Sequence, residues 1–180
     1  MTFYRVTGFW DLGHKLYRTT PKTYPAKFLA GDALDDAHLS LTIPAPSDPL
    51  LPVESINSLT ELRGHISAAY ASSLFHLFDE EEQFELGKRL AGLLDPRPGS
   101  LIFGSHSAGL VKGQRSDPFM KLFCHSPESW TQMWEEQIFE KGQVKVDTVL
   151  NEMYVTAEGR MLPAGGGTTL YWLSWSVERL

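Results

Sequence analysis

Two histidines that follow short apolar segments are the first candidates for chemistry. His76 comes after the small-residue run 66–71, and His106 comes after Ser105 and the apolar run 101–104. An imidazole has a pKa of about 6.5, so it can accept or donate a proton near neutral pH. If both runs are strands of an α/β sheet, both histidines fall at the edge where ligands bind. We predict that His106, helped by His76, moves a proton at a carbonyl-bearing carbon.

Polar residues near His106 complete the candidate site. Ser105 or Gln114 would stabilise an enolate oxygen, and Arg115 would bind a carbonyl or carboxylate. The alternative for His76 is a packing role, and the alternative for His106 is an exposed loop position. Metal binding is not expected, because no pair of histidines has the spacing of metal ligands and Cys124 is the single cysteine.

The surrounding sequence predicts alternating strands and helices, hence the α/β class with a mostly parallel sheet. Asp79 and Glu82 have the spacing of a capping box, and Ser126 precedes a proline that suits a first helical position. Two long runs near the end predict an antiparallel hairpin. The expected strands are 1–10, 66–71, 101–104, 144–156 and 168–177; the expected helices are 11–17, 79–94 and 126–142; the expected loops are 43–52, which is rich in proline, 104–109 and 164–167.

Composition limits the class of protein and its partners. The chain has 180 residues, with 16 Lys and Arg against 22 Asp and Glu, so its net charge is −6. An acidic chain does not fit nucleic acid as the main partner. No apolar run is long enough to cross a bilayer, and the first residues do not resemble a signal peptide. We therefore expect a cytoplasmic protein without membrane or nucleic-acid partners.

Residues 55–180 resemble the fungal methyltransferases that tailor polyketide-derived meroterpenoids. The resemblance rests on the segment 71–78, the acidic helix after it and the segment 98–104. It implies an incomplete Rossmann-like class I methyltransferase fold, in which these parts are the fourth strand, the next helix and the fifth strand. The segments 8–13 and 30–32 look like remnants of the second and third strands, and 173–177 looks like the last strand.

The sequence departs from this family where the cofactor should bind. Members bind S-adenosylmethionine on a glycine-rich turn after the first strand, and no such turn precedes Gly8. Asp32 matches a position that usually lies near the adenine, and Trp10 could cover a bulky apolar ligand there. We expect one natively short domain, residues 1–180, that needs no cofactor. The missing strand, together with the apolar stripe of Trp130, Trp134 and Phe139, predicts a homodimer.

The resemblance implies a terpenoid-polyketide substrate rich in carbonyl groups. We expect a non-redox rearrangement or cyclisation of a β-dicarbonyl substrate, of the Claisen, retro-Claisen or aldol type, that needs only proton transfer and enolate stabilisation. Two alternatives stay open. One is a non-catalytic partner of a full-length methyltransferase, and the other is a methyltransferase that another chain completes.

Overall fold

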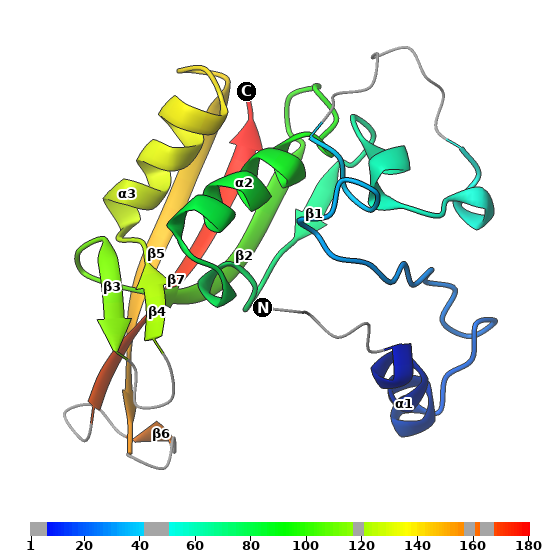
Figure 1. Ribbon diagram of the computed structural model, residues 1–180, viewed down its shortest axis with the longest axis horizontal. Coiled ribbons are helices and arrows are strands. Elements are labelled where there is room, and N and C mark those ends of the chain that lie inside the picture. The colour runs from blue at the N-terminus through cyan, green and yellow to red at the C-terminus, as the bar shows by residue number, and fades with distance from the viewer. Residues whose placement is uncertain (1–6, 42–50, 117–120, 157–160, 163–167) are drawn as a thin grey trace.

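A mixed five-stranded sheet with helices α2 and α3 on one face is the centre of the molecule (Figure 1). The computed structural model describes residues 7–41, 51–116, 121–156, 161–162 and 168–180. The strand order is β1-β2-β7-β5-β6, and β3 and β4 form a separate pair. The elements are α1 (Thr7–Tyr17), β1 (Ala68–Tyr70), α2 (Glu80–Ala91), β2 (Leu101–Ala108), β3 (Gly113–Ser116), β4 (Lys121–Cys124), α3 (Pro127–Gln132), β5 (Val144–Val155), β6 (Met161–Leu162) and β7 (Thr168–Arg179).

The strand directions confirm the α/β class and the C-terminal antiparallel hairpin. β1 pairs with β2 in parallel, whereas β7 is antiparallel to both β2 and β5. β1, β2 and β5 therefore run in the same direction, and β7 is inserted between β2 and β5 in the opposite direction. The expected parallel pairing is limited, among the described strands, to β1 and β2, because the insertion of β7 separates β5 from β2.

The N-terminal segment differs from its expected structure. Residues 7–10 belong to helix α1 and not to a strand. Phe9, Leu12 and Leu16 recur at helical spacing, and no described strand pairs with this segment, so helical hydrogen bonds satisfy its backbone. Residues 1–6 of the expected strand, most of the proline-rich loop 43–52 and the turn 164–167 lie outside the described residues.

The helix starts follow the sequence closely. The Asp79 carboxylate accepts a hydrogen bond from the Glu82 amide at 2.9 Å, and the Glu82 carboxylate accepts one from the Asp79 amide at 3.1 Å. This capping box satisfies amides at the start of α2 that have no partner within the helix. Ser126 is the N-cap of α3. A π-helical segment, Met133–Ile138, continues from the end of α3.

Aromatic side chains fill the space between the sheet and its helices. Trp130 and Trp134 have no solvent exposure, and their ring centroids lie 4.9 and 6.2 Å from that of Trp175 on β7. Phe75 meets Trp130 edge to face at 4.9 Å. The expected apolar stripe is therefore core, since the chain buries both of its tryptophans itself. They supply no dimer interface.

The sheet has an open edge at β1. Among the described residues, β1 pairs with β2 alone, so from Ala68 to Tyr70 its other side has no strand partner. Just before β1, the Ile66 amide donates to the Leu93 carbonyl and the Ile66 carbonyl accepts from the Asp95 amide. Tyr70 at this edge is 70% exposed and contacts Phe103 on β2, with ring centroids 5.2 Å apart. This open edge is the place where a further strand would extend the sheet.

Candidate functional site

His106 lies inside β2 and not in a loop after a strand. Its side chain is 1% exposed and packs against the rings of Trp130, Phe75 and Trp175, with centroids 4.5, 5.8 and 5.9 Å away. The expected loop 104–109 is strand up to Ala108, because β2 pairs with β7 along its whole length. The predicted base therefore sits in the aromatic core.

The environment of His106 keeps its imidazole neutral. Burial, followed by the nearby His125 and His76, lowers the pKa of His106 to about 3. The Trp175 indole N–H donates a hydrogen bond to His106 Nδ1 at 3.0 Å, so the neutral ring carries its proton on Nε2. Within the described residues, His106 Nε2 is buried without a hydrogen-bond partner. These properties fit a packed core residue better than a base that meets a substrate.

Ser105 and His106 lie on opposite faces of the sheet. Successive side chains of a strand alternate, so the buried Ile102, His106 and Ala108 face the helices, while Ser105 and Ser107 face the other side. The Ser105 hydroxyl lies 2.9 Å from that of Ser72. Ser105 therefore cannot stabilise an oxygen bound at His106.

His76 is the histidine that the structure places among polar groups near the end of β1. The Ser107 amide donates a long hydrogen bond of 3.4 Å to His76 Nδ1. The ring centroid of Trp172 lies 5.8 Å from that of His76. We call these groups the His76 site, which consists of Ser72, His76, Ser105, Ser107 and Trp172.

The hydrogen bond to Nδ1 fixes what His76 can do. Because Nδ1 accepts, the neutral ring carries its proton on Nε2 and presents a donor there. Burial lowers the pKa of His76. The ring is half-buried, so it keeps contact with solvent. With Nδ1 occupied, the neutral His76 ring offers an N–H donor on Nε2.

Gln114 and Arg115 lie on β3, a strand that the sequence did not predict. Gln114 is exposed. The Arg115 guanidinium donates to the Ala108 carbonyl at 2.7 Å and lies 5.3 Å from the centroid of the Tyr171 ring. Arg115 therefore ties β3 to the end of β2, and neither residue is placed beside His76 by any described contact.

Trp10 belongs to a separate aromatic group on and after α1. Its ring stacks on Phe28 at 5.1 Å and meets His14 edge to face at 5.1 Å. A cavity of about 400 Å³ beside it is lined by Phe9, Trp10, Tyr17 and Tyr24, among others. Trp10 thus borders a cavity, and no described contact connects this cavity to His76. Ligand binding at Trp10 stays a prediction.

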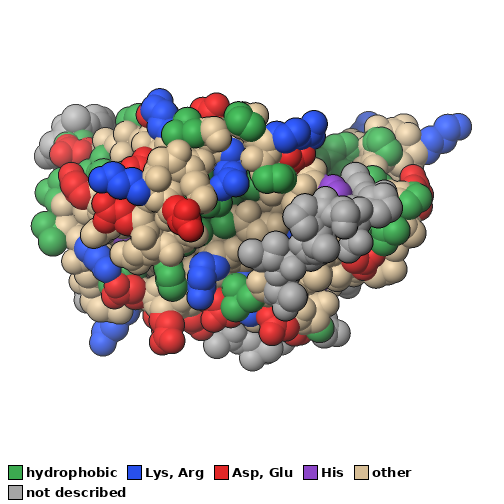
Figure 2. All heavy atoms as spheres, turned by 90° about the horizontal axis from the view of Figure 1, so that it is seen from above, with side chains coloured by type: hydrophobic (Ala, Val, Ile, Leu, Met, Phe, Trp, Pro, Cys, Tyr) green, Lys and Arg blue, Asp and Glu red, His purple; other side chains and the backbone are tan. Residues whose placement is uncertain are grey.

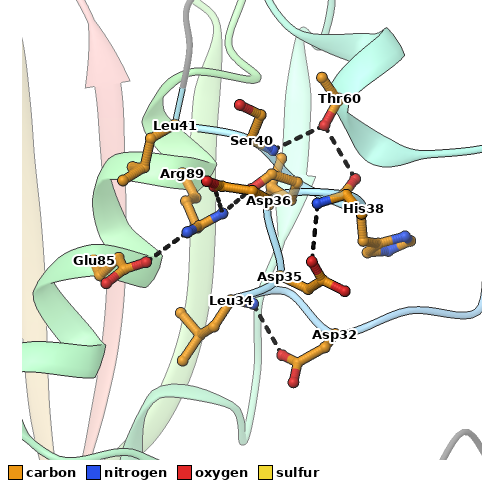
Figure 3. A network of polar contacts seen from close by, with 12 residues as sticks. Asp32, Leu34, Asp35, Asp36, His38, Ser40, Leu41, Thr60, Glu85 and Arg89 are labelled. Carbon is orange, nitrogen blue, oxygen red and sulfur yellow. Dashed lines mark hydrogen bonds and ion pairs between the residues drawn. The ribbon is translucent and has the colours of Figure 1, made fainter.

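Asp32 starts a turn that is held against α2 (Figure 3). Its carboxylate accepts a hydrogen bond from the Leu34 amide at 2.9 Å. Further along, the buried Arg89 binds Asp36 at 2.8 Å and Glu85 at 2.6 Å and donates to the Leu39 carbonyl. The strand that the resemblance implied at 30–32 is irregular backbone here.

The described residues do not by themselves fit S-adenosylmethionine. Gly8 and Gly13 lie within α1 and not on a turn after a strand, so they offer no close backbone approach to a cofactor. Asp32 is a single matching carboxylate. A Cβ on the adjacent Gly31 would lie 2.2 Å from the His38 ring, so that glycine serves internal packing.

A second buried histidine, His125, lies just before α3. His125 is 3% exposed, and burial, followed by the charge of Lys112, lowers its pKa to about 4. Its ring lies 5.5 Å from Trp130. This contact is local in sequence, because His125 lies between the end of β4 and the start of α3, which carries Trp130. Within the described part of the chain, no three His, Cys, Asp or Glu side chains gather as metal ligands.

Comparison with known proteins identifies relatives over most of the chain. The O-methyltransferase phiE of Fungal sp. is 31% identical over 137 residues, which are 75% of this chain and 39% of phiE. The methyltransferase adrK of Penicillium rubens is 29% identical over 77% of this chain and 44% of adrK. The chain is a relative of fungal methyltransferases. The Asnovolin E/Chermesin D methyltransferase nvfJ of Aspergillus novofumigatus is 28% identical over 78% of this chain and 42% of nvfJ.

The relatives are much longer than this chain. The chain spans about two fifths of the length of the curated relatives it matches. No protein-family model matches it. A solved SAM-dependent methyltransferase from Methanosarcina mazei aligns with 66% of this chain and 61% of that chain, at a TM-score of 0.43 and 12% identity. The family relationship therefore rests on the fungal sequences. No helix in the described ranges is long and apolar enough to cross a bilayer.

Proposed function

We propose that this methyltransferase relative takes part in the tailoring of a fungal secondary metabolite and binds an acceptor oxygen of that molecule through His76. The observation that carries the proposal is the hydrogen bond from the Ser107 amide to His76 Nδ1, which leaves the proton on Nε2. An imidazole N–H beside an aromatic ring suits an oxygen on a small organic molecule. The expected substrate is a terpenoid-polyketide hybrid with carboxylate or carbonyl groups.

Because His76 offers a hydrogen-bond donor and no base, the chemistry at the bound oxygen is restricted. Protonation of Nδ1 would break the bond from Ser107, and burial already disfavours the charged ring. His76 therefore orients an oxygen that carries no removable proton, such as a carboxylate or a ketone. Two reaction classes meet this condition.

The first class is transfer of a methyl group to the bound oxygen, as the names of the relatives suggest. A carboxylate needs no base to act as the nucleophile. The cofactor would have to be held by residues other than those described, in a part of the protein or a partner chain that supplies the remaining fold. In this class the chain contributes substrate orientation.

The second class is the cofactor-independent rearrangement of a β-dicarbonyl substrate. The His76 donor favours it as well, because a hydrogen bond to a carbonyl oxygen strengthens when that oxygen becomes an enolate. This reaction needs a separate base, and the buried His106 is a poor one. We rank it second for that reason.

The test is incubation of the purified chain with a prenylated aromatic β-keto acid, with and without S-adenosylmethionine, followed by mass spectrometry. A product heavier by one CH₂ group supports methyl transfer, and an isomer of the substrate supports rearrangement. We expect His76→Ala to lower the rate at least about tenfold, since it removes a hydrogen bond to a charged oxygen. Gln132→Ala, which changes an exposed polar residue of α3 outside the site, is the control.

Three outcomes would contradict the proposal. The first is full activity in His76→Ala. The second is an equal loss of activity in Gln132→Ala. The third is a product that forms only when a full-length fungal methyltransferase is added, at the same rate with His76→Ala, which would favour a non-catalytic partner.

A further inference from the structure

A basic cavity lies at the edge of the sheet opposite the His76 site. Its volume is about 630 Å³, within the range of small-molecule sites. It is lined by residues that precede β1, by the end of α2 and by the end of β7. His76 follows the C-terminal end of β1, whereas this cavity adjoins the N-terminal ends of β1 and β2. The two sites are therefore separate.

Positive charge is concentrated in this cavity although the chain is acidic. Three cations, Arg63, Lys88 and Arg179, line it beside His65, and no Asp or Glu is found among its described lining residues. The nearby carboxylate of Asp95 is engaged by Arg97 at 2.9 Å. Figure 2 looks onto this end of the molecule and shows blue side chains beside a hollow near its centre. The net charge of the chain is −6, so the local excess of cations is not a property of the whole surface.

No carboxylate of a described residue neutralises the positive charge of Arg63, which lines the cavity. Its side chain is buried, at 3% exposure, and it donates to the backbone carbonyls of Ser40 and Leu41. Its Nε has no hydrogen-bond partner among the described residues. A buried cation without a carboxylate is costly, and an anion nearby would offset part of that cost.

Lys88 and Arg179 are the cations placed to contact a ligand. Lys88 lies 4.7 Å from the centroid of Phe84, and Arg179 lies 5.0 Å from that of Phe139. Neither side chain has an ion pair with a described residue, so both remain able to bind an anion. The charged ends of both side chains lie over these rings, and the contacts limit the entropy that is lost on binding.

The remaining lining is apolar and defines the rest of the ligand. Leu41, Leu94, Ile138 and Phe139 contribute to the same cavity. Cations on one part of the wall and aliphatic side chains on another suit an amphiphilic molecule. We propose that this cavity binds a small organic anion with an apolar body, whose carboxylate or phosphate group contacts Lys88 and Arg179.

Calorimetric titration of the full chain with decanoate, decyl phosphate and decanol tests the proposal. The two anions share the same tail, so their relative affinities distinguish a carboxylate ligand from a phosphate ligand. Decanol measures the contribution of the tail alone. We expect at least one anion to bind at least about tenfold more tightly than decanol, because hydrogen bonds to charged groups are stronger than neutral ones. Equal binding of all three compounds, or no binding, overturns the proposal.

Variants show whether the binding belongs to this cavity. The double variant Lys88→Met, Arg179→Met should weaken binding of the anion at least about tenfold, and Lys88→Arg should retain it. Lys121→Met, which removes an exposed lysine on β4, is the matched control, and circular dichroism checks the fold of each variant. Unchanged binding in the double variant refutes the assignment. His76→Ala should leave binding of the anion unchanged. The result of this binding test is therefore independent of whether the proposed function is correct.

Discussion

His76 and His106 show how the immediate surroundings of a residue decide its chemistry. Both rings accept a hydrogen bond at Nδ1, from Ser107 and from Trp175 respectively. The His106 ring is closed in by three aromatic side chains, whereas the His76 ring is half-buried beside Trp172. The same side chain is therefore a core residue on β2 and a candidate ligand contact after β1.

The buried His106 makes the stability of the protein depend on pH. Its pKa is lowered from 6.5 to about 3 in the folded chain, so between these values the unfolded chain binds more protons. We therefore expect the contribution of His106 to the free energy of unfolding to be complete above about pH 6.5 and to be lost as the pH drops toward 3. His125, whose pKa is lowered to about 4, acts in the same direction.

Urea unfolding between pH 7 and pH 4 measures this dependence. His106→Gln should flatten the fall in stability, because it removes one group that gains a proton on unfolding. Ser107→Ala is the control, since it changes the neighbouring residue of β2 without removing a titratable group. A fall of the same steepness in His106→Gln would show that other groups are responsible.

Helix α2 depends on a cap that is visible in the sequence. Asp79→Ala removes the acceptor for the Glu82 amide and should lower the free energy of unfolding by about 1 kcal/mol. Glu81→Ala changes an exposed residue of the same turn outside the capping box and should have a much smaller effect. The shift of the urea midpoint measures both changes, and equal shifts would contradict the role of the cap.

The junction of β1 and β2 depends on one glycine. A Cβ on Gly104 would lie 2.0 Å from the Ala71 carbonyl oxygen, and this backbone atom cannot move aside cheaply. We expect Gly104→Ala to destabilise the protein by about 1–3 kcal/mol. Gly13→Ala in α1 meets nothing within 4 Å and should not destabilise. A melting temperature of Gly104→Ala equal to that of the parent chain would contradict this reading.

The elements could be predicted where local signals were sufficient. The caps at Asp79 and Ser126 and the long terminal strands depend on neighbours in sequence, and the structure confirms them. The segment 104–109 has the glycine and serine content of a loop, yet pairing with β7 makes most of it strand. The helix predicted at 11–17 is confirmed, but α1 already begins at Thr7. Residues 7–10 were predicted as strand, because aromatic residues such as Phe9 and Trp10 are also typical of strands.

The candidate site was harder to predict than the elements. A sequence shows that His76 and His106 follow apolar runs, but not which face of β2 each neighbouring side chain takes. That face follows from the register with β7, which aligns His106 with Leu173 and Ser107 with Trp172. The aromatic burial that lowers the pKa of His106 likewise arises from elements far apart in the chain.

At the scale of the whole molecule, the homodimer remains a prediction, and it rests on the open edge of β1. Tyr70 and Phe103 form an exposed aromatic pair there. Light scattering should give about twice the chain mass of 20.2 kDa. Tyr70→Lys should shift the protein toward the monomer, because a charge at a strand edge opposes pairing. Val111→Lys, at a site that is 78% exposed, is the control. A monomeric parent chain would contradict the prediction.

The two buried arginines have a consequence for recombination between relatives. Arg89 binds the Leu39 carbonyl from α2, and Arg63 binds the carbonyls of Ser40 and Leu41. The chain that leads from α1 to β1 therefore passes through residues 39–41, whose carbonyls these two arginines bind. In a chimaera that takes its residues up to position 41 from a relative, both guanidinium groups would have to bind backbone carbonyls of that relative. In a chimaera joined before Asp36, the two arginines and the carbonyls that they bind come from the same parent. We therefore expect crossovers that preserve the sheet to lie before Asp36.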